Sequence, residues 1–467
     1  MVAADLVRPR RPDPCRRAAS CHHPKVLRAA SSPLAALARV RREMAPRRST
    51  ASAAHRAAVT DAWRALWTSR LIVWCAGIGA VLAFGLSGRE AAFDPVGVTA
   101  PFGAPGDLLV APAARWDAVW FLSVAQDGYA QGASEAFFPL YPALVAVVGG
   151  LLRSAPAGGI AVSLACLAGA LYLLHRLAAL DFGREVAATT VALLALSPAA
   201  VFLSAVYSES LFLVLSVGAV LAARTDRWWA AGALGALAAC TRSAGVVLMV
   251  PLALMYLYGP RGAGAWEPRG GRVALRPRFP VRADALAVGL VPLGLLAYCA
   301  VLALSGQDPL GPFAAQEAWL RAFAGPFVGA WDGAMAAVQG ARQMLSGARE
   351  PVLFTAAAGD PFTVAGHNLH LFAWLVAALV ALVGAARRLP AAYTAYAAAA
   401  LALPLSWPVG PQPLMSLPRF LLVLWPLWLW LALWTRGRPG RRRVAVALCA
   451  AGLVVSTGLF ATWHWIA

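Results

Sequence analysis

The residues best suited to chemistry lie in a short polar segment that follows the first long apolar run. The segment reads Arg115-Trp116-Asp117-Ala118, and Phe137-Phe138-Pro139-Leu140-Tyr141-Pro142 comes soon after it. A carboxylate near hydrocarbon is costly in free energy, so an acid at a membrane edge indicates a functional group. Such a carboxylate can accept a proton from a hydroxyl group, which makes Asp117 our candidate general base.

Four further polar segments interrupt the apolar sequence. They are 204–210 with Tyr207, Ser208 and Glu209; 241–243 with Arg242; 306–366 with Gln316, Glu317, Trp319 and Arg321; and 416–419 with Arg419. Arginine binds phosphate through a planar fork of N–H groups, so these arginines could hold an anionic group. Arg242 and Arg419 are the first candidates and Arg321 is the third.

Composition places the chain among membrane proteins. Hydrophobic residues make up 60% and charged residues 13%, with a mean hydropathy of +0.66, whereas soluble domains carry about 25% charged residues. The net charge of +19 would suggest nucleic acid for a soluble protein. Here the arginines lie in the N-terminal tail and in short loops, where they orient spans, so no nucleic-acid partner is expected.

The apolar runs predict an all-α polytopic membrane protein with about eleven spans. We predict spans at 71–87, 157–174, 186–203, 208–223, 228–241, 243–258, 284–305, 367–386, 390–407, 419–435 and 444–462. The apolar run 138–152 is interpreted as a juxtamembrane helix in the first outer loop, because only then do the arginine-rich loops all face the cytoplasm. The N-terminus is then cytoplasmic, and all five polar segments lie on the extracytoplasmic face of the cell membrane.

Two domains are expected. Residues 1–69, rich in Arg, Ala, Ser and Pro, are predicted to be a disordered basic cytoplasmic tail, with Met44 as an alternative start, and 70–467 form the transmembrane domain. Residues 59–69 could form a short interfacial helix carrying Trp63 and Trp67. The seven cysteines form no CxxC pair, so neither a disulfide framework nor a metal site is expected.

Each candidate residue also has a purely structural interpretation. Asp117 could cap a helix or pair with Arg115, and Glu209 could cap the helix that begins near Leu211. Arg242 could anchor a helix end by reaching to the interface. The remaining candidates could be boundary, loop-ordering or interfacial residues: Arg419, Gln316, Trp319, Arg321 and Trp116.

The motifs resemble those of the PIG-V family, the GPI mannosyltransferase 2-like enzymes, and indicate a bacterial member of the GT-C membrane glycosyltransferases. The similar segments are the Arg115-Trp116-Asp117 region with 136–142, then 197–211, then 241–245, and more weakly Gln316 with Trp319 and Pro418 with Arg419. Position 244 departs from the pattern, with Ala where eukaryotic members have Asn. Bacteria do not make the eukaryotic GPI anchor, so the resemblance does not identify the acceptor.

The resemblance implies a mannosyltransferase that uses polyprenyl-phosphate mannose and a lipid-linked or cell-envelope acceptor on the outer face. We expect an inverting reaction with Asp117 as general base. A donor without a diphosphate removes the usual need for a divalent metal, and the chain has no DxD pair, so no cofactor is expected. The expected substrate-binding residues are Arg115, Trp116, Tyr207, Ser208, Glu209, Arg242, Gln316, Trp319, Arg321 and Arg419.

Two other classes of protein fit the spans. A lipid or glycolipid transporter or flippase would explain them equally well, but it predicts charges in mid-span or an internal repeat. Neither feature is found in the sequence. A structural scaffold leaves the convergence of polar segments on one face unexplained.

Overall fold

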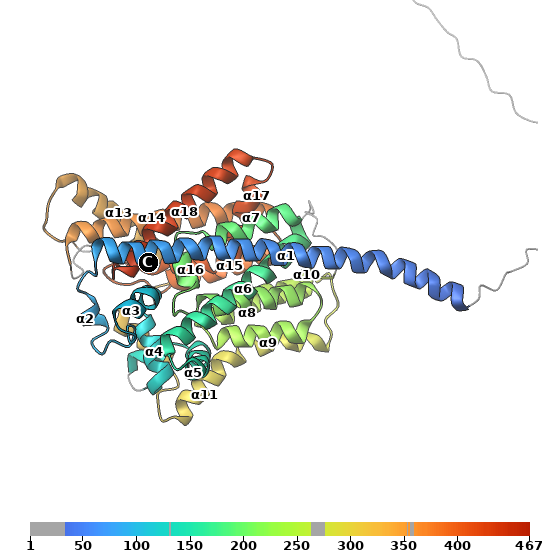
Figure 1. Ribbon diagram of the computed structural model, residues 1–467, viewed down its shortest axis with the longest axis horizontal. Helices are drawn as coiled ribbons and strands as arrows, with labels where there is room; N and C mark the ends of the chain where they lie inside the picture. Colours follow the sequence, from blue (N-terminus) through green and yellow to red (C-terminus); the bar gives the residue numbers. More distant parts are fainter. Residues whose placement is uncertain (1–32, 130–131, 263–275, 353, 355–358) are drawn as a thin grey trace, which may run out of the picture. The chain divides into compact units, whose positions relative to one another are not determined.

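The computed structural model describes residues 33–129, 132–262, 276–352, 354 and 359–467, and this part of the chain is helical with one isolated bridge between Arg321 and Val409 (Figure 1). The chain divides into two compact units, Met1–Ala53 and Ala54–Ala467. The α-helices are α1 (Pro33–Phe84), α2 (Glu90–Phe93), α3 (Ala104–Val110), α4 (Ala118–Asp127), α5 (Leu140–Leu152), α6 (Ala155–Phe182), α7 (Arg184–Ala195), α8 (Glu209–Arg224), α9 (Trp228–Ala239), α10 (Met249–Tyr258), α11 (Leu293–Leu304), α12 (Gly311–Ala314), α13 (Pro326–Ser346), α14 (Pro361–Arg388), α15 (Ala391–Leu405), α16 (Leu417–Leu422), α17 (Trp425–Thr435) and α18 (Pro439–Ala461). The 3-10 helices are η1 (Ala111–Ala113), η2 (Gly132–Ala136), η3 (Ala200–Leu203), η4 (Ser243–Leu248), η5 (Ala283–Leu290) and η6 (Ala315–Trp319).

Every predicted span coincides with helical structure, which confirms the all-α polytopic class. In the part of the chain that the structure describes, four helices are long and apolar enough to cross a membrane, namely those at 52–84, α6, α14 and α18. The number rises to six if each of two bent helix pairs is counted as one span. The other predicted spans are shorter helices, such as the 12 residues of α7 and of α9. A span needs about 20 residues, so the predicted count of eleven full crossings is not confirmed.

The predicted N-terminal tail differs from the structure in part. Residues 1–32 lie outside the described residues, whereas 33–69 belong to α1. Ala58, Ala62, Ala65 and Ser69 are buried at intervals of three or four residues, the spacing of one helix face. The boundary predicted at 69/70 therefore falls inside a helix, and the predicted interfacial helix at 59–69 is a continuous part of α1.

The predicted first outer loop, 88–137, contains helices that the sequence did not indicate. The pair Ala104–Ala113 and Ala118–Asp127 bends by 104°, and the break between its two arms contains Asp117. The predicted juxtamembrane helix is present as α5, with 13 residues. α5 packs against α6 through Gly158, where a Cβ atom would lie 2.4 Å from the backbone nitrogen of Gly149.

The predicted loop 306–366 also contains a long helix. α13 has 21 residues and lies beside α14 (Figure 1). Its Gly329 allows close approach to α15, because a Cβ atom there would meet the Leu405 carbonyl oxygen at 2.0 Å. α13 therefore packs against both α14 and α15.

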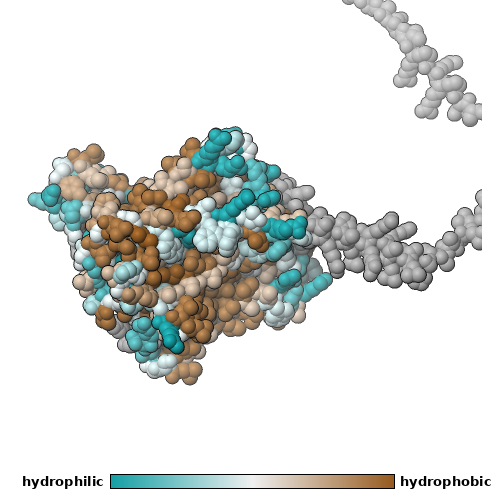
Figure 2. All heavy atoms as spheres, in the orientation of Figure 1, coloured by the Kyte–Doolittle hydropathy of each residue, from teal (hydrophilic) through white to brown (hydrophobic). Residues whose placement is uncertain are grey.

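The apolar core lies among α6, α8 and their neighbours, and much of the visible surface over these helices is apolar as well. Leu167, Leu171 and Leu174 of α6 and Leu213 of α8 are fully buried. Figure 2 shows apolar side chains spread over the flank where α6, α8 and α9 lie, with hydrophilic side chains gathered in patches. An apolar core together with an apolar flank fits a multi-pass membrane protein.

Candidate active site

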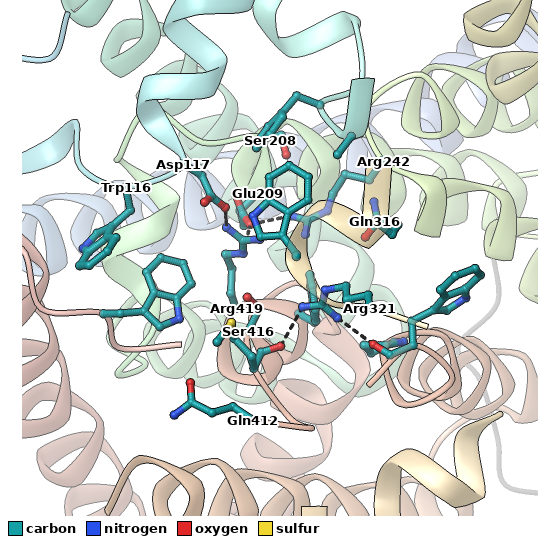
Figure 3. A pocket seen from close by; sticks show the side chains of 18 of the residues that line it. Trp116, Asp117, Ser208, Glu209, Arg242, Gln316, Arg321, Gln412, Ser416 and Arg419 are labelled. Atoms are coloured by element: carbon teal, nitrogen blue, oxygen red, sulfur yellow. Dashed lines mark hydrogen bonds and ion pairs between the residues drawn. The ribbon is translucent and has the colours of Figure 1, made fainter. Parts of the chain in front are cut away.

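All five predicted polar segments line one cavity of about 1010 Å³ in the second unit. Figure 3 shows its polar side chains converging from separate helices and loops. Nine of the predicted site residues line it: Trp116, Asp117, Ser208, Glu209, Arg242, Gln316, Trp319, Arg321 and Arg419. The volume lies at the upper end of the range of about 300–1,000 Å³ for small-molecule sites.

Asp117 is held at the break before α4. It occupies the N-cap position, yet its side chain makes no capping hydrogen bond. Its backbone N–H donates to the Tyr207 hydroxyl at 3.0 Å, and the same hydroxyl donates to the Arg115 carbonyl at 3.0 Å. Trp116 has a φ of +58°, a left-handed conformation that costs about 1–2 kcal/mol for a residue with a side chain. This local fold turns the Asp117 carboxylate toward the cavity.

Four charged residues form a continuous chain of ion pairs. Arg419 Nη1 donates to Asp117 Oδ2, and Arg419 Nε lies 3.3 Å from Glu209 Oε1 without hydrogen-bond alignment. Glu209 Oε1 also accepts from Arg242 Nη1 at 2.6 Å. Figure 3 shows Arg419 between Asp117 and Glu209, with Arg242 beyond Glu209. The two carboxylates balance the formal charge of these two arginines.

This arrangement bears on the structural interpretations considered for three of these residues. Asp117 pairs with Arg419 and not with Arg115, and it does not cap α4. Glu209 is the first residue of α8, but its side chain binds two arginines, and Oε2 is buried with no hydrogen-bond partner among the described residues. The Arg242 side chain is 15% exposed and directed to Glu209, so it does not extend outward from a helix end.

Arg321 also lines the cavity, but its partners are backbone carbonyls and not carboxylates. Its Nη1 and Nη2 donate to the carbonyls of Trp407 and Met415, at 3.0 and 3.1 Å. Among the described residues, no carboxylate lies within ion-pairing distance of it. Burial, and then the charge of Arg419, lowers the pKa of Arg321 to about 10, so it is still cationic at neutral pH.

Three guanidinium groups surround one aromatic ring. The Cζ atoms of Arg242, Arg419 and Arg321 lie 5.4, 5.5 and 5.8 Å from the ring centroid of Phe420. Such distances allow cation–π attraction. Three cations with two carboxylates leave one net positive charge in this part of the cavity, which suits an anionic group such as a phosphate.

Two predicted substrate-binding residues, Arg115 and Tyr207, do not line the cavity. Tyr207 is fully buried, and its hydroxyl supports the backbone of residues 115 and 117. Arg115 is 4% exposed, donates to the Ala461 carbonyl at 3.2 Å and lies 5.1 Å from the Trp463 ring. Burial lowers the pKa of Arg115 to about 10. Both residues position the segment that carries Asp117.

Sequence reasoning missed several residues that line the cavity. His367 begins a predicted span, and Gln412 lies in a short segment between two others; both line the cavity. Trp465 lines it too, beyond the last predicted span. In the sequence, each of these three residues lies at or near the edge of an apolar run. No spacing connects the three positions, so the sequence did not predict that they line one cavity.

The fold and the site define a class: a multi-pass helical membrane protein with a cavity lined by charged residues. Residues 105–257 match the family model described as Mannosyltransferase (PIG-V). This match confirms the predicted resemblance to the PIG-V family over that range, which includes Asp117, Glu209 and Arg242. Arg321 and Arg419 lie outside the matched range.

Curated relatives agree with the family match over a similar share of the chain. The GPI alpha-1,6-mannosyltransferase 2 of Rattus norvegicus is 38% identical over 172 residues, 33% of this chain and 34% of the relative. The proteins of the same name from Mus musculus and Homo sapiens are 37% and 36% identical, over 32% and 28% of this chain and 33% and 29% of theirs. The chain thus aligns with about a third of the length of the curated relatives it matches.

A solved structure is also similar in part. It is the archaeal oligosaccharyltransferase AglB from Archaeoglobus fulgidus, in complex with an inhibitory peptide and a dolichol-phosphate. The two chains are 13% identical, with a TM-score of 0.36, over 71% of this chain and 48% of that one. At this score the likeness assigns no residue of the cavity.

Proposed function

We propose that this protein transfers a mannosyl group from polyprenyl-phosphate mannose to a lipid-linked or cell-envelope acceptor. The observation that carries the proposal is the position of Asp117: an acid inside the family-matched segment, turned into a cavity with a net cationic cluster. The named activity of the relatives supports mannose as the sugar. By the positive-inside rule, the cavity opens to the outer face of the cell membrane and the N-terminus is cytoplasmic.

Asp117 acts as the general base in this proposal. Oδ2 is held by Arg419, whereas among the described residues no group donates to Oδ1. Oδ1 takes the proton of the acceptor hydroxyl as that oxygen bonds to the anomeric carbon. The bond from the anomeric carbon to the phosphate oxygen breaks, and the lipid phosphate leaves with the electron pair. A single displacement inverts the configuration of the sugar.

Arg321 and Arg242 hold the leaving phosphate. Arg321 carries the charge that no carboxylate balances, and Arg242 has N–H groups beyond the one that binds Glu209. Guanidinium groups that face the departing oxygen stabilise the developing charge in the transition state. Arg419 is a positioning residue here, because its Nη1 donates to Asp117 and its Nε lies within ion-pairing distance of Glu209.

The arginine cluster supplies the positive charge that a divalent metal provides in other transferases. We therefore propose a metal-independent reaction. Trp116 and Trp319 also line the cavity, and their rings offer flat apolar surfaces on which a sugar can stack.

Radiolabelled polyprenyl-phosphate mannose tests the proposal directly. Membranes containing the protein should convert this donor to a labelled glycolipid or envelope glycan, with and without EDTA, and GDP-mannose should not substitute for it. Normally inserted protein that yields no labelled product would contradict the function. A reaction abolished by EDTA and restored by a divalent cation would contradict metal independence alone.

A further inference from the structure

The connection between α15 and α16, residues 406–416, joins the groups on several sides of the cavity. The carbonyls of Trp407 and Met415 bind Arg321. Between them, the Gln412 side chain binds His367, and the connection leads into the helix that carries Arg419. The segment 406–416 thus binds Arg321 and leads to Arg419, the ion-pair partner of Asp117. It also positions the neutral polar side chains of Gln412 and His367.

His367 has a defined hydrogen-bond state in this arrangement. Its Nδ1 lies 3.1 Å from the Gln412 amide nitrogen, which can only donate, so Nδ1 accepts. A neutral imidazole that accepts at one nitrogen carries its proton on the other. Nε2 of His367 is buried and has no hydrogen-bond partner among the described residues. The wall of the cavity therefore contains an N–H donor that no protein group uses.

The chemistry around His367 differs from that around the arginine cluster. Gln412 and Ser416 are uncharged cavity residues, and the carboxylate on this side, Asp360, caps α14 by accepting from the Thr363 backbone and hydroxyl at 3.0 Å each. In Figure 3, Gln412 lies on the other side of Arg419 from Arg242. Neutral donors and acceptors suit the hydroxyl groups of a sugar better than a phosphate.

Aromatic side chains accompany these polar groups. Trp116 and Trp465 both line the cavity, and their ring centroids are 5.4 Å apart. Figure 3 shows Trp116 on the opposite side of Asp117 from Arg242. Indole faces stack on sugar rings, and amide and imidazole groups bind the hydroxyls at the ring edge, so the two features together describe a carbohydrate site.

Building on the proposed transferase function, we propose that His367 and Gln412 form the acceptor subsite and bind an uncharged sugar residue of the acceptor. An inverting displacement requires the attacking hydroxyl and the leaving phosphate on opposite faces of the transferred sugar. Arg242 of the arginine cluster takes one face, and Gln412 lies on the other side of Arg419 from it (Figure 3). The subsite holds the acceptor so that its reacting hydroxyl meets the free Oδ1 of Asp117.

Three variants test the subsite. His367→Phe keeps a planar ring but removes the N–H donor, and His367→Gln restores a donor at similar reach. His370→Phe is the matched control, because His370 lies one turn further along α14, accepts from the Trp374 indole and does not line the cavity. Gln412→Leu tests the partner independently, should His367→Phe fail to fold.

The probe for the acceptor is a total glycolipid extract from cells that lack this protein, added in graded amounts at saturating labelled donor. His367→Phe and Gln412→Leu should raise the half-saturating amount of extract by about 2- to 10-fold, the loss expected for one hydrogen bond. His367→Gln should recover part of that loss. The KM for donor should stay within about 2-fold for all variants, which also shows that the proteins are folded.

The possible results distinguish a failure of the acceptor-subsite proposal from a failure of the proposed transferase function on which it rests. A wild-type protein that labels nothing contradicts the transferase proposal itself. If the wild type is active, the subsite is overturned by an unchanged requirement for extract in folded His367→Phe and Gln412→Leu proteins. It is equally overturned if these variants raise the KM for donor instead, or if His370→Phe has the same effect as His367→Phe.

Discussion

Arg419 and Asp117 lie 302 residues apart in the sequence and form an ion pair in the wall of the cavity. The pair leaves one carboxylate oxygen of Asp117 without a donor among the described residues, in a cavity whose lining includes Arg242, Arg321 and Arg419. Arg419 also approaches the buried Glu209, so a single guanidinium sets the orientation of both acids. Its contribution to the reaction is thus expected to be geometric.

Arg419→Lys tests that geometric role. Lysine keeps the charge but has no planar fork, so it cannot hold Asp117 and Glu209 together. We expect kcat to fall by about 10- to 100-fold, the range for losing one or two charged hydrogen bonds, with little change in the KM for donor. Arg441→Lys, at an exposed arginine of α18, is the control. A rise in donor KM without a fall in kcat would indicate that Arg419 binds the phosphate itself.

Arg321→Ala, unlike Arg419→Lys, should weaken the binding of the donor. It removes the charge that no carboxylate balances, so the donor should bind more weakly in the ground state and in the transition state. A loss of about 10- to 100-fold in kcat/KM for donor is expected, and Arg321→Lys should restore part of it. Arg342→Ala changes an exposed arginine of α13 outside the cavity and should have no effect. A wild-type kcat/KM for donor in folded Arg321→Ala protein would show that Arg321 does not bind the donor.

Tyr207→Phe removes the hydroxyl group that hydrogen-bonds to the backbone of residues 115 and 117. Two buried backbone groups, the N–H of residue 117 and the carbonyl of residue 115, would lose their partner. We expect the free energy of unfolding to fall by about 1–3 kcal/mol and kcat to fall by about 10-fold or more through misplacement of Asp117. Tyr298→Phe, which loses one bond to the Glu135 carbonyl away from the cavity, should lower stability without that loss of rate. Thermal unfolding in detergent and steady-state kinetics measure the two effects.

The orientation of the spans is open to a direct measurement. If α5 does not cross the bilayer, reporter fusions at about residue 180 and about residue 270 should both report a cytoplasmic location. Both positions follow α5 and are flanked by arginines in the sequence. An extracytoplasmic signal at either one would show that the inside and outside assignments of the later segments are wrong.

Sequence motifs indicated one side of the cavity because its residues are clustered in short polar segments. Asp117, Glu209 and Arg242 interrupt apolar runs, and a polar residue in such a place is noticeable without a structure. Their pairing was not predicted, because an ion pair such as that of Arg419 with Asp117 depends on how distant helices pack. The structural interpretations considered for Asp117 remained open in the sequence for the same reason.

The other side of the cavity could not be inferred in this way. His367 is the first residue of a predicted span, and a single histidine at such an edge carries no pattern. Its partner Gln412 lies 45 residues further along the chain and is brought to it by the tertiary fold. The helices α4 and α13 were missed because the runs that form them are short or mixed in polarity, so they were assigned to loops. The number of full crossings stays a prediction for a related reason, since apolar composition does not distinguish a short buried helix from a span.

Asp117→Asn provides the most direct test of the account, compared with Asp127→Asn, which changes an exposed acid at the far end of the same helix. Asparagine keeps the size of the side chain but removes the basic oxygen. With labelled polyprenyl-phosphate mannose and equal amounts of inserted protein, kcat of Asp117→Asn should fall by about 10²- to 10⁴-fold. The KM for donor should change little, and Asp127→Asn should match the wild type. Transfer by Asp117→Asn at the wild-type rate would contradict the assignment of Asp117 as the base and leave Glu209 as the next acid to test.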